Sequence, residues 1–432
     1  MKNLFFILIS AALVGCNVSK QIAKSAKKEV LDEPALQTAH VGISIFEPAT
    51  SKYWYNYQGD HYFTPASNTK IPTCYAAMKY LGDSIPGLKY RDTDSVIFIK
   101  PTGDPTLLHR DISSQRVFEF LKTIQKKIAY VIPRWEAEIY GQGWSWDDYN
   151  ANYMPERCEL PIYGNLIKLR LQQSGTRYYL KSDIYFFRYA INSYVMPMSP
   201  AIRIRRRRCD NTFDVFDGNG NFSEVEIPFR TWENERLLED TLKKAWLNDV
   251  YPPDTLNYKT IYSLPTDTLL KITMHKSDNL FAEQSLLMVS DKLLGVMNDE
   301  KIIDTLLQID FKSLPQKPHW ADGSGLSRYN LFTPQDLVFI LNKMKDDFGM
   351  ERIKNILPTG SEGTLSNYYL PEKGYIFAKT GSLSGVVTIS GFLYTKKNKL
   401  LIFSVLVNNH TGSATEIRRA VEKFIEGVRN NY

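Results

Sequence analysis

The chain has 432 residues, of which 43% are hydrophobic and 13% aromatic, enough to bury one large core or about two to three smaller ones. Lys and Arg outnumber Asp and Glu by 53 to 47, and this net charge of +6 is too small for the length to favour a nucleic-acid partner. Basic and acidic residues are mostly interspersed, so the composition predicts a globular protein and argues against nucleic-acid binding.

The N-terminus predicts export. Lys2 precedes an apolar run over residues 4–14, which is too short for a mature membrane helix but fits a signal peptide. The run ends in Leu-Val-Gly-Cys at residues 13–16, which resembles a bacterial lipobox in which Cys16 is lipidated. A conventional signal peptide cleaved nearby is the alternative. Residues 1–15 are therefore predicted to be a lipoprotein signal peptide, and the lysine-rich residues 16–35 a tether.

Both kinds of signal take the protein out of the cytoplasm. A lipid on Cys16 anchors it in the bacterial cell envelope, on the periplasmic face of a membrane. Asn17, rather than Asp, follows the cysteine, which in enteric bacteria favours the outer membrane. We therefore expect an exported protein that is held to the outer membrane by its N-terminal lipid.

The next elements predict the start of a domain. Residues 40–46 and 52–57 have the pattern of two strands joined by a short turn, and a helix opens near Ser67. Residues 89–251 differ in texture, with short, aromatic-rich, strand-like runs and no internal repeat. They are predicted to be an inserted, mostly β accessory region.

The C-terminal part resembles the start in texture. Its predicted elements are a strand at 375–378, a strand at 386–394, a strand at 400–407 after a hairpin turn at 396–399, and an amphipathic helix over 414–428. We expect the strands of both ends to share one antiparallel sheet. Residues 36–88 and 252–432 are therefore predicted to form one domain around the insertion.

Three cysteines follow Cys16. Cys74 lies in the apolar register of the helix after Ser67, which favours a buried free thiol. Cys158 and Cys209 are then the candidate pair for a disulfide in an oxidising compartment, and two free thiols are the alternative. No Cys/His cluster has zinc-ligand spacing, so no metal or cofactor is expected.

Three short motifs carry the chemistry. Ser67 and Lys70 form a Ser-x-x-Lys pattern, which alone is weak evidence because the pattern also occurs at Ser25–Lys28. The chain has a single Ser-x-Asn, at residues 277–279, and a single Lys-Thr-Gly, at residues 379–381, and they follow Ser67 in that order. Each has an ordinary structural explanation, a helix cap or a strand-end turn. The ordered combination favours a catalytic site.

The residue types suit acyl transfer. Positions three apart share a helix face, so Lys70 can contact the Ser67 hydroxyl and act as its base when neutral. Ser277 is predicted to pass the proton between Lys70 or Lys379 and the leaving nitrogen, and Asn279 to bind a substrate amide. The backbone N–H of Ser67 is one predicted donor to the oxyanion.

The Lys-Thr-Gly segment is the predicted substrate-binding strand. Lys379 and Thr380 suit a terminal carboxylate, and an edge strand can pair with an extended peptide. Gly381 permits close approach of that peptide. The backbone N–H of Ser382 is predicted to complete the oxyanion hole.

The three motifs together resemble those of penicillin-binding proteins and serine β-lactamases. The long gap between Ser67 and Ser277 resembles the class C low-molecular-mass penicillin-binding proteins, the D-Ala-D-Ala carboxypeptidases of peptidase family S13. Four further stretches look like that family's motifs over residues 36–432: residues 103–107, 143–148, 322–327 and 377–382. Pro101-Thr102 and the shortened loop at 357–360 depart from its pattern.

The resemblance implies an α/β fold of the serine β-lactamase and penicillin-binding-protein transpeptidase type. In this fold an antiparallel sheet is flanked by helices and joined by a helical subdomain, and here a large, mostly β region is inserted. It also implies a serine D-Ala-D-Ala carboxypeptidase, with endopeptidase activity as a further option. The implied partners are peptidoglycan stem peptides and β-lactams as covalent inhibitors.

Two other readings have less support. A Ser-His-Asp hydrolase is disfavoured because no Gly-x-Ser-x-Gly occurs and His275 is the one histidine near a motif serine. A non-enzymatic wall-binding lipoprotein requires all three motifs to be idle. The arginine run at 203–208 fits either a solvated edge or a contact with anionic polymer. Trp144 and Trp146 suit either packing or sugar stacking.

Overall fold

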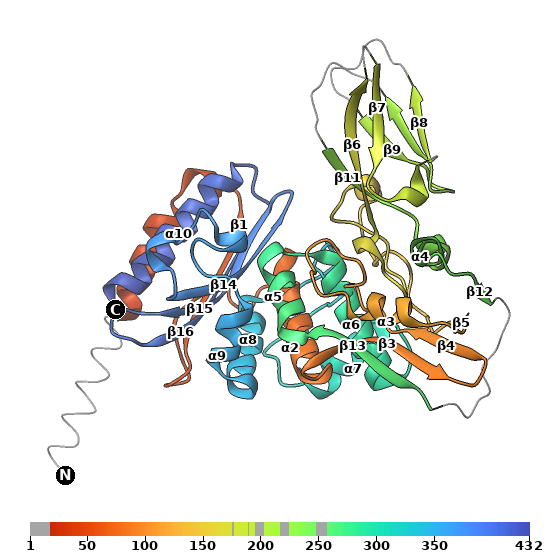
Figure 1. Cartoon of the computed structure of the whole chain (residues 1–432). Coiled ribbons are helices and arrows are strands. Elements are labelled where there is room, and N and C mark those ends of the chain that lie inside the picture. The colour runs from red at the N-terminus through yellow and green to blue at the C-terminus, as the bar shows by residue number, and fades with distance from the viewer. Residues whose placement is uncertain (1–17, 175–176, 189, 195–202, 217–223, 248–256) are drawn as a thin grey trace, which may run out of the picture. The chain divides into compact units, whose positions relative to one another are not determined.

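The computed structural model describes residues 18–174, 177–188, 190–194, 203–216, 224–247 and 257–432 (Figure 1). The predicted signal peptide and Cys16 lie outside these residues. The chain divides into two compact units. The first unit comprises the described residues up to Ala76 together with Asp267–Asp278 and Ile303–Tyr432, and the second comprises Ala77–Thr266 and Asn279–Ile302.

The first unit contains one sheet and most of the long helices. Its strands are β1 (His40–Glu47), β2 (Lys52–Tyr57), β14 (Ile376–Leu383), β15 (Val386–Tyr394) and β16 (Leu400–Asn408). Its helices are η1 (Lys27–Leu31), η2 (Pro34–Leu36), η3 (Ala66–Thr69), α5 (Thr266–Lys276), α8 (Pro334–Phe348), α9 (Met350–Ile356), η8 (Gly363–Leu365), η9 (Leu370–Glu372) and α10 (Ala414–Asn431). Helices α2 (Lys70–Tyr80) and α7 (Asp299–Ile309) contribute to both units.

The sheet joins the two ends of the chain. Its strand order is β14-β15-β16-β1-β2 and every pairing is antiparallel, with Ile43 of β1 opposite Val405 of β16. This confirms the predicted shared sheet. The alternation of apolar residues places one face of the sheet against α10 (Figure 1), whose predicted apolar residues are all buried: Ile417, Ala420, Val421, Phe424 and Val428. Helix α8 packs on β1 and β16.

The segment predicted as a tether is folded where the structure describes it. Residues 18–26 are helical and continue into η1, and the side chains of Ile22, Ala26 and Val30 are fully buried. They belong to the same core as α10, and Glu29 pairs with Lys423 of that helix at 2.6 Å. Their four-residue spacing forms an apolar stripe on one side of the helix. The high lysine content of the segment led to the prediction of a tether instead.

The second unit is built mainly from strands. They are β3 (Ser84–Asp92), β4 (Val96–Pro101), β5 (Lys127–Tyr130), β6 (Leu166–Ser174), β7 (Arg177–Ser182), β8 (Ile191–Tyr194), β9 (Arg203–Arg206), β10 (Phe213–Phe216), β11 (Glu224–Pro228), β12 (Trp246–Leu247) and β13 (Lys259–Pro265). The helices are α3 (Arg116–Thr123), α4 (Asn234–Leu242), α6 (Asn279–Leu294), η4 (Trp146–Asn150), η5 (Tyr163–Asn165), η6 (Tyr185–Phe187) and η7 (Thr231–Glu233).

The second unit is larger than the predicted insertion of residues 89–251. A five-stranded sheet has the order β12-β5-β4-β3-β13, and two three-stranded sheets have the orders β11-β6-β7 and β8-β10-β9. Strand β3 pairs with both β4 and β13, so both flanks of the predicted insertion belong to its sheet. Helix α6 also belongs here, because Gln284 donates hydrogen bonds to the carbonyls of Gly103 and Cys158.

The predicted Cys158–Cys209 disulfide is not formed. Both residues are free thiols, as is the buried Cys74. The sulfur of Cys158 is buried between the side-chain amides of Asn165 and Asn234, at 3.4 and 3.5 Å, whereas Cys209 is exposed. A disulfide requires two sulfur atoms that face each other, and sequence spacing does not report that direction.

Within the described residues, no helix is both long enough and apolar enough to cross a membrane.

Candidate active site

Ser67 and Lys70 meet at the entry of α2. Ser67 lies in the short η3 helix, partly exposed, and its Oγ accepts a hydrogen bond from Lys70 Nζ at 3.0 Å. Lys70 is fully buried and also donates to the carbonyl of Ser324 at 2.6 Å. The motif spacing thus places the buried amine of Lys70 in hydrogen-bond contact with the partly exposed hydroxyl of Ser67.

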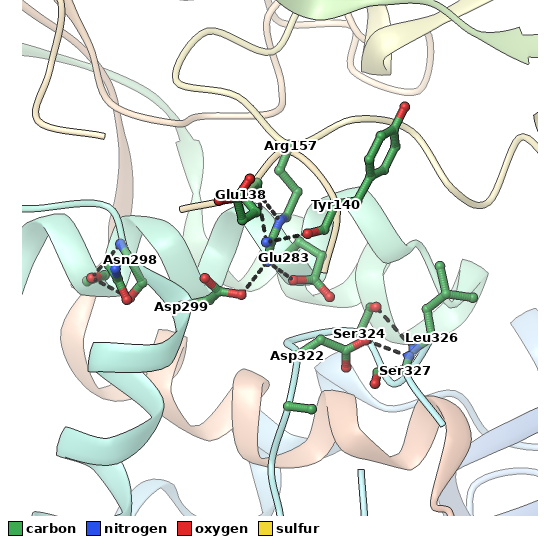
Figure 2. Close-up of polar contacts among 12 residues, drawn as sticks. Glu138, Tyr140, Arg157, Glu283, Asn298, Asp299, Asp322, Ser324, Leu326 and Ser327 are labelled. Carbon is green, nitrogen blue, oxygen red and sulfur yellow. Dashed lines mark hydrogen bonds and ion pairs between the residues drawn. The ribbon is translucent and has the colours of Figure 1, made fainter. Parts of the chain in front are cut away.

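The loop at 322–327 holds the second partner of Lys70 (Figure 2). The carboxylate of Asp322 accepts the backbone N–H groups of Gly325 and Ser327, each at 2.7 Å. Gly325 has a φ of +82°, and a Cβ on it would lie 1.9 Å from the carbonyl oxygen of Ala66. Only glycine fits this approach, which positions the Ser324 carbonyl against Lys70. The sequence identified this stretch as a family motif but did not indicate its contact with Lys70.

Backbone strain accompanies two of the motifs. Ala66, directly before Ser67, has a φ of +47°, and Ser277 has a φ of +58°. Such conformations cost free energy for residues with a Cβ and concentrate at functional sites. Around Ala66, Asn68 donates to Thr388 Oγ1, which in turn donates to the carbonyl of Pro65 at 2.8 Å. These bonds hold η3 against β15.

Lys379 is a second buried lysine at the site. It is fully buried on β14, and its Nζ donates to the carbonyl of Thr380 at 2.7 Å. Burial, and then the nearby charge of Lys70, hold the pKa of Lys379 well below its usual value. Two ammonium groups are unfavourable together in such a place, so burial and the neighbouring charge favour the neutral form of the Lys379 amine.

The edge strand β14 runs beside the nucleophile. A Cβ on Gly381 would lie 2.9 Å from the backbone nitrogen of Ser67 and 2.8 Å from the carbonyl oxygen of Pro65. The N–H of Ala378 points to the outer edge, where it bonds the carbonyl of Pro358 at 3.1 Å. Because strand groups alternate, Thr380 and Ser382 present their backbone groups at the same edge. The predicted oxyanion pair, the N–H groups of Ser67 and Ser382, therefore fits this geometry.

Ser277 lies at the junction of α5 and α6, and its side chain is partly buried. It makes no hydrogen bond to any residue that the structure describes, so its role in proton transfer stays a prediction. His275 does not support the alternative of a Ser-His-Asp hydrolase. Its Nε2 is buried without a hydrogen-bond partner in the described part of the chain.

Asn279 is the first residue of α6 and belongs to the second unit. Its side-chain amide donates to the carbonyl of Tyr153 at 2.8 Å. One turn further on, Glu283 accepts from the buried Arg157 at 3.1 Å, and Arg157 also bonds Asp299 at 2.6 Å (Figure 2). An ion network inside the second unit thus fixes the helix that Asn279 begins.

An antiparallel sheet flanked by helices, with a serine hydroxyl bonded to a buried lysine beside the edge strand, is typical of the penicillin-binding class of serine hydrolases. The model of the D-Ala-D-Ala carboxypeptidase 3 (S13) family matches residues 22–428, and the chain belongs to this family. The match begins within the N-terminal helix, upstream of the expected start at residue 36.

Two of the relatives cover most of the chain at low identity. A penicillin-sensitive carboxypeptidase A of Dictyostelium discoideum is 23% identical over 84% of this chain and 81% of its own length. A D-alanyl-D-alanine carboxypeptidase of Actinomadura sp. is 24% identical over 89% of this chain and 80% of its own length. The crystal structure of penicillin binding protein 4 from Haemophilus influenzae superposes with a TM-score of 0.76 at 19% identity, covering 95% of this chain and 98% of that one.

The predicted family, fold class and enzyme class are therefore confirmed: the chain is a serine-type D-Ala-D-Ala carboxypeptidase with a penicillin-binding-protein fold. The roles assigned to individual residues stay predictions. Their geometry is as described above for Ser67, Lys70 and the Lys379–Ser382 strand.

Proposed function

We propose that this protein removes the terminal D-alanine from peptidoglycan stem peptides through an acyl-enzyme on Ser67. The observation that carries the proposal is the 3.0 Å contact between Ser67 Oγ and the fully buried Lys70 Nζ. A lysine beside a second buried lysine can be neutral and accept the serine proton. The family assignment supplies the substrate class.

The reaction follows from these groups. Ser67 Oγ attacks the carbonyl carbon of the penultimate D-alanine while Lys70 takes the hydroxyl proton. The oxyanion is stabilised by the N–H groups of Ser67 and Ser382. The C–N bond then breaks, and the leaving amine receives a proton through Ser277. A water molecule hydrolyses the ester, releases the shortened peptide and restores the Ser67 hydroxyl.

A β-lactam undergoes the same first steps of the reaction but leaves a persistent acyl-enzyme. Attack of Ser67 opens the lactam ring, and the leaving nitrogen remains tethered to the acyl group. The ester therefore persists, and the protein is labelled covalently by a fluorescent penicillin. A cleavable cross-link between two stem peptides offers the same amide bond, so endopeptidase activity is a second prediction. Mass analysis of products from digested peptidoglycan separates the two activities.

Location is a separate part of the proposal. The apolar run at residues 4–14 and Cys16 support export and lipidation, with the enzyme on the periplasmic face of the outer membrane. Metabolic labelling with a radioactive fatty acid tests this. A Cys16→Ser variant that still incorporates label contradicts the lipid assignment.

The catalytic proposal is tested at Ser67. Ser67→Ala should abolish labelling by fluorescent penicillin and release of D-alanine, while the thermal unfolding curve stays close to wild type. Ser25→Ala is the matched control, because Ser25 belongs to the other Ser-x-x-Lys pattern, and it should label normally. A covalent adduct on Ser67→Ala would place the nucleophile elsewhere.

A further inference from the structure

The N-terminal helix carries an exposed row of lysines. Residues 18–31 contain four lysines and a single acidic residue, Glu29. The side chains of Lys20, Lys24 and Lys27 are exposed, and their three- and four-residue spacing places them on one face of the helix. Within the described residues, none of these three lysines takes part in an ion pair. This face of the helix is therefore a positive surface that no described carboxylate neutralises.

Packing holds these lysines toward solvent. Glu29 lies on another side of the helix, where it bonds Lys28 at 3.0 Å and Lys423 of α10 at 2.6 Å. The apolar side of the helix lies against α10 (Figure 1) and consists of three fully buried residues: Ile22, Ala26 and Val30. Because the core fixes the rotation of the helix about its own axis, the row of lysines has a fixed direction relative to the first unit.

A hairpin turn adds two lysines next to this helix. Tyr432 donates its hydroxyl to Gln21 Oε1 at 3.1 Å, and its carbonyl accepts the N–H of Lys397 at 3.1 Å. Lys396 and Lys397 are both exposed, and neither forms an ion pair with any residue that the structure describes. The term lysine surface refers below to five residues: Lys20, Lys24, Lys27, Lys396 and Lys397.

The lysine surface begins close to the proposed lipid. Val18 is two positions after Cys16, and two extended residues span at most about 7 Å. This length is shorter than the Debye length of about 8 Å at physiological ionic strength, so a lipid on Cys16 brings the start of the helix within range of headgroup charges. We propose that the lysine surface binds anionic phospholipid headgroups and holds the first unit against the membrane. The proposal rests on the lipidation of Cys16 that is proposed above.

The nucleophile lies on the other face of the sheet. Thr388 of β15 donates its hydroxyl to the carbonyl of Pro65, two residues before Ser67, at 2.8 Å. The strand neighbours of Thr388, Val387 and Ile389, lie in the core shared with α10. Since successive side chains of a strand point to opposite faces, η3 and α10 cover opposite faces of the sheet. A membrane on the side of the N-terminal helix therefore leaves Ser67 turned away from the bilayer.

The test uses the chain from residue 16 with Cys16→Ser, so that no lipid contributes to binding. Cosedimentation is measured with vesicles of phosphatidylcholine and phosphatidylglycerol, and with vesicles of phosphatidylcholine alone. The protein should bind the anionic vesicles, and less as the salt concentration rises. Changing Lys20, Lys24 and Lys27 together to Gln should lower the partition coefficient for anionic vesicles about 10- to 100-fold, because three charges near the anionic surface are removed.

A matched control changes three other lysines to Gln: Lys271, Lys312 and Lys317. They are also exposed and form no ion pair within the described part of the chain. They lie in α5 and in the segment before α8, outside the core shared by the N-terminal helix and α10. This control removes the same charge and should lower the partition coefficient less than about threefold. If the first variant fails to fold, Lys396→Gln combined with Lys397→Gln tests the same surface from the hairpin.

Three results would overturn the proposal. They are equal binding of the test variant and its parent to anionic vesicles, equal binding of the parent to both kinds of vesicle, and binding to soluble polyphosphate without binding to anionic vesicles. The last result would assign the surface to an anionic polymer. Labelling by fluorescent penicillin tests the proposed catalysis separately, and it should proceed equally fast with and without anionic vesicles. Fatty-acid incorporation reports on Cys16 alone, so a failure of lipidation is told apart from a failure of the lysine surface.

Discussion

Lys70 combines burial, contact with Ser67 and a fixed carbonyl partner in Ser324. Lys70→Arg should lower the rate of penicillin acylation by about 100-fold or more, since a guanidinium is not deprotonated in proteins and general-base catalysis contributes about 10²- to 10⁴-fold. Rapid-mixing kinetics with a fluorescent penicillin measure this rate, and a thermal unfolding curve controls for misfolding. Acylation near the wild-type rate would show that another group takes the Ser67 proton.

The lowered pKa of Lys379 makes the stability of the folded protein depend on pH. Burial and the Lys70 charge lower its pKa in the folded state, while an unfolded lysine keeps its proton to about pH 10.4. Between these two values the unfolded state binds more protons, so the stability of wild type rises with pH over that window. Below the lowered pKa the folded protein must carry a buried charge.

Replacing Lys379 by an uncharged residue should therefore stabilise the folded protein relative to wild type, and most at low pH. Lys379→Met is expected to raise Tm relative to wild type, by roughly 2–4 °C more at pH 6 than at pH 9. Unfolding curves of both proteins across this range provide the measurement. A Tm difference that does not change with pH would mean that Lys379 titrates like an exposed lysine.

At the scale of elements, the N-terminal helix is part of the first unit. Ile22 is fully buried in the core that α10 completes, whereas Lys24 is exposed. Ile22→Ala should lower the free energy of unfolding by about 2–5 kcal/mol through lost burial and a cavity, and Lys24→Ala by less than about 0.5 kcal/mol. Chemical denaturation measures both. If the two variants are equally stable, residues 18–31 act as a tether after all.

Three residues of the arginine run at 203–208 have contacts within the second unit. Arg206 is fully buried, bonds Glu156 at 3.2 Å and lies over the ring of Tyr149 at 4.0 Å. Arg207 pairs with Asp214, and Arg208 lies over Trp146 at 4.5 Å. Arg206 is therefore part of the packing of the second unit, whereas Arg205 and Arg208 are exposed. Trp144 packs similarly, under Arg157 at 5.6 Å.

At the scale of the whole molecule, the free thiols can be counted chemically. In a version that begins at Val18, a thiol reagent should label Cys209 under native conditions, and Cys74 and Cys158 only after unfolding, because both are buried. Burial also raises the pKa of the Cys74 thiol, to about 12. Mass spectrometry after each step reads the result, and reductant should leave Tm unchanged. A drop in Tm with reductant would indicate a disulfide.

Local signals determined much of this protein. Apolar alternation predicted β1, β2, β15 and β16, and the helical apolar stripe predicted α10, because these patterns depend on the periods of strand and helix alone. The spacing of Ser67 and Lys70 predicted their contact for the same reason. The ordered trio of motifs then indicated the family, whose match spans residues 22–428.

Only the tertiary structure decided the features that depend on distant residues. It brought Ser324 to Lys70 across more than 250 positions of sequence, bonded Arg418 to Ser382, separated Cys158 from Cys209, and paired β3 with β13. It also buried the lysine-rich N-terminal segment against α10. Sequence patterns report which residues can be buried or charged. Which side chains face one another is set by long-range packing, because the direction of each Cα–Cβ bond is fixed only when the whole core has assembled.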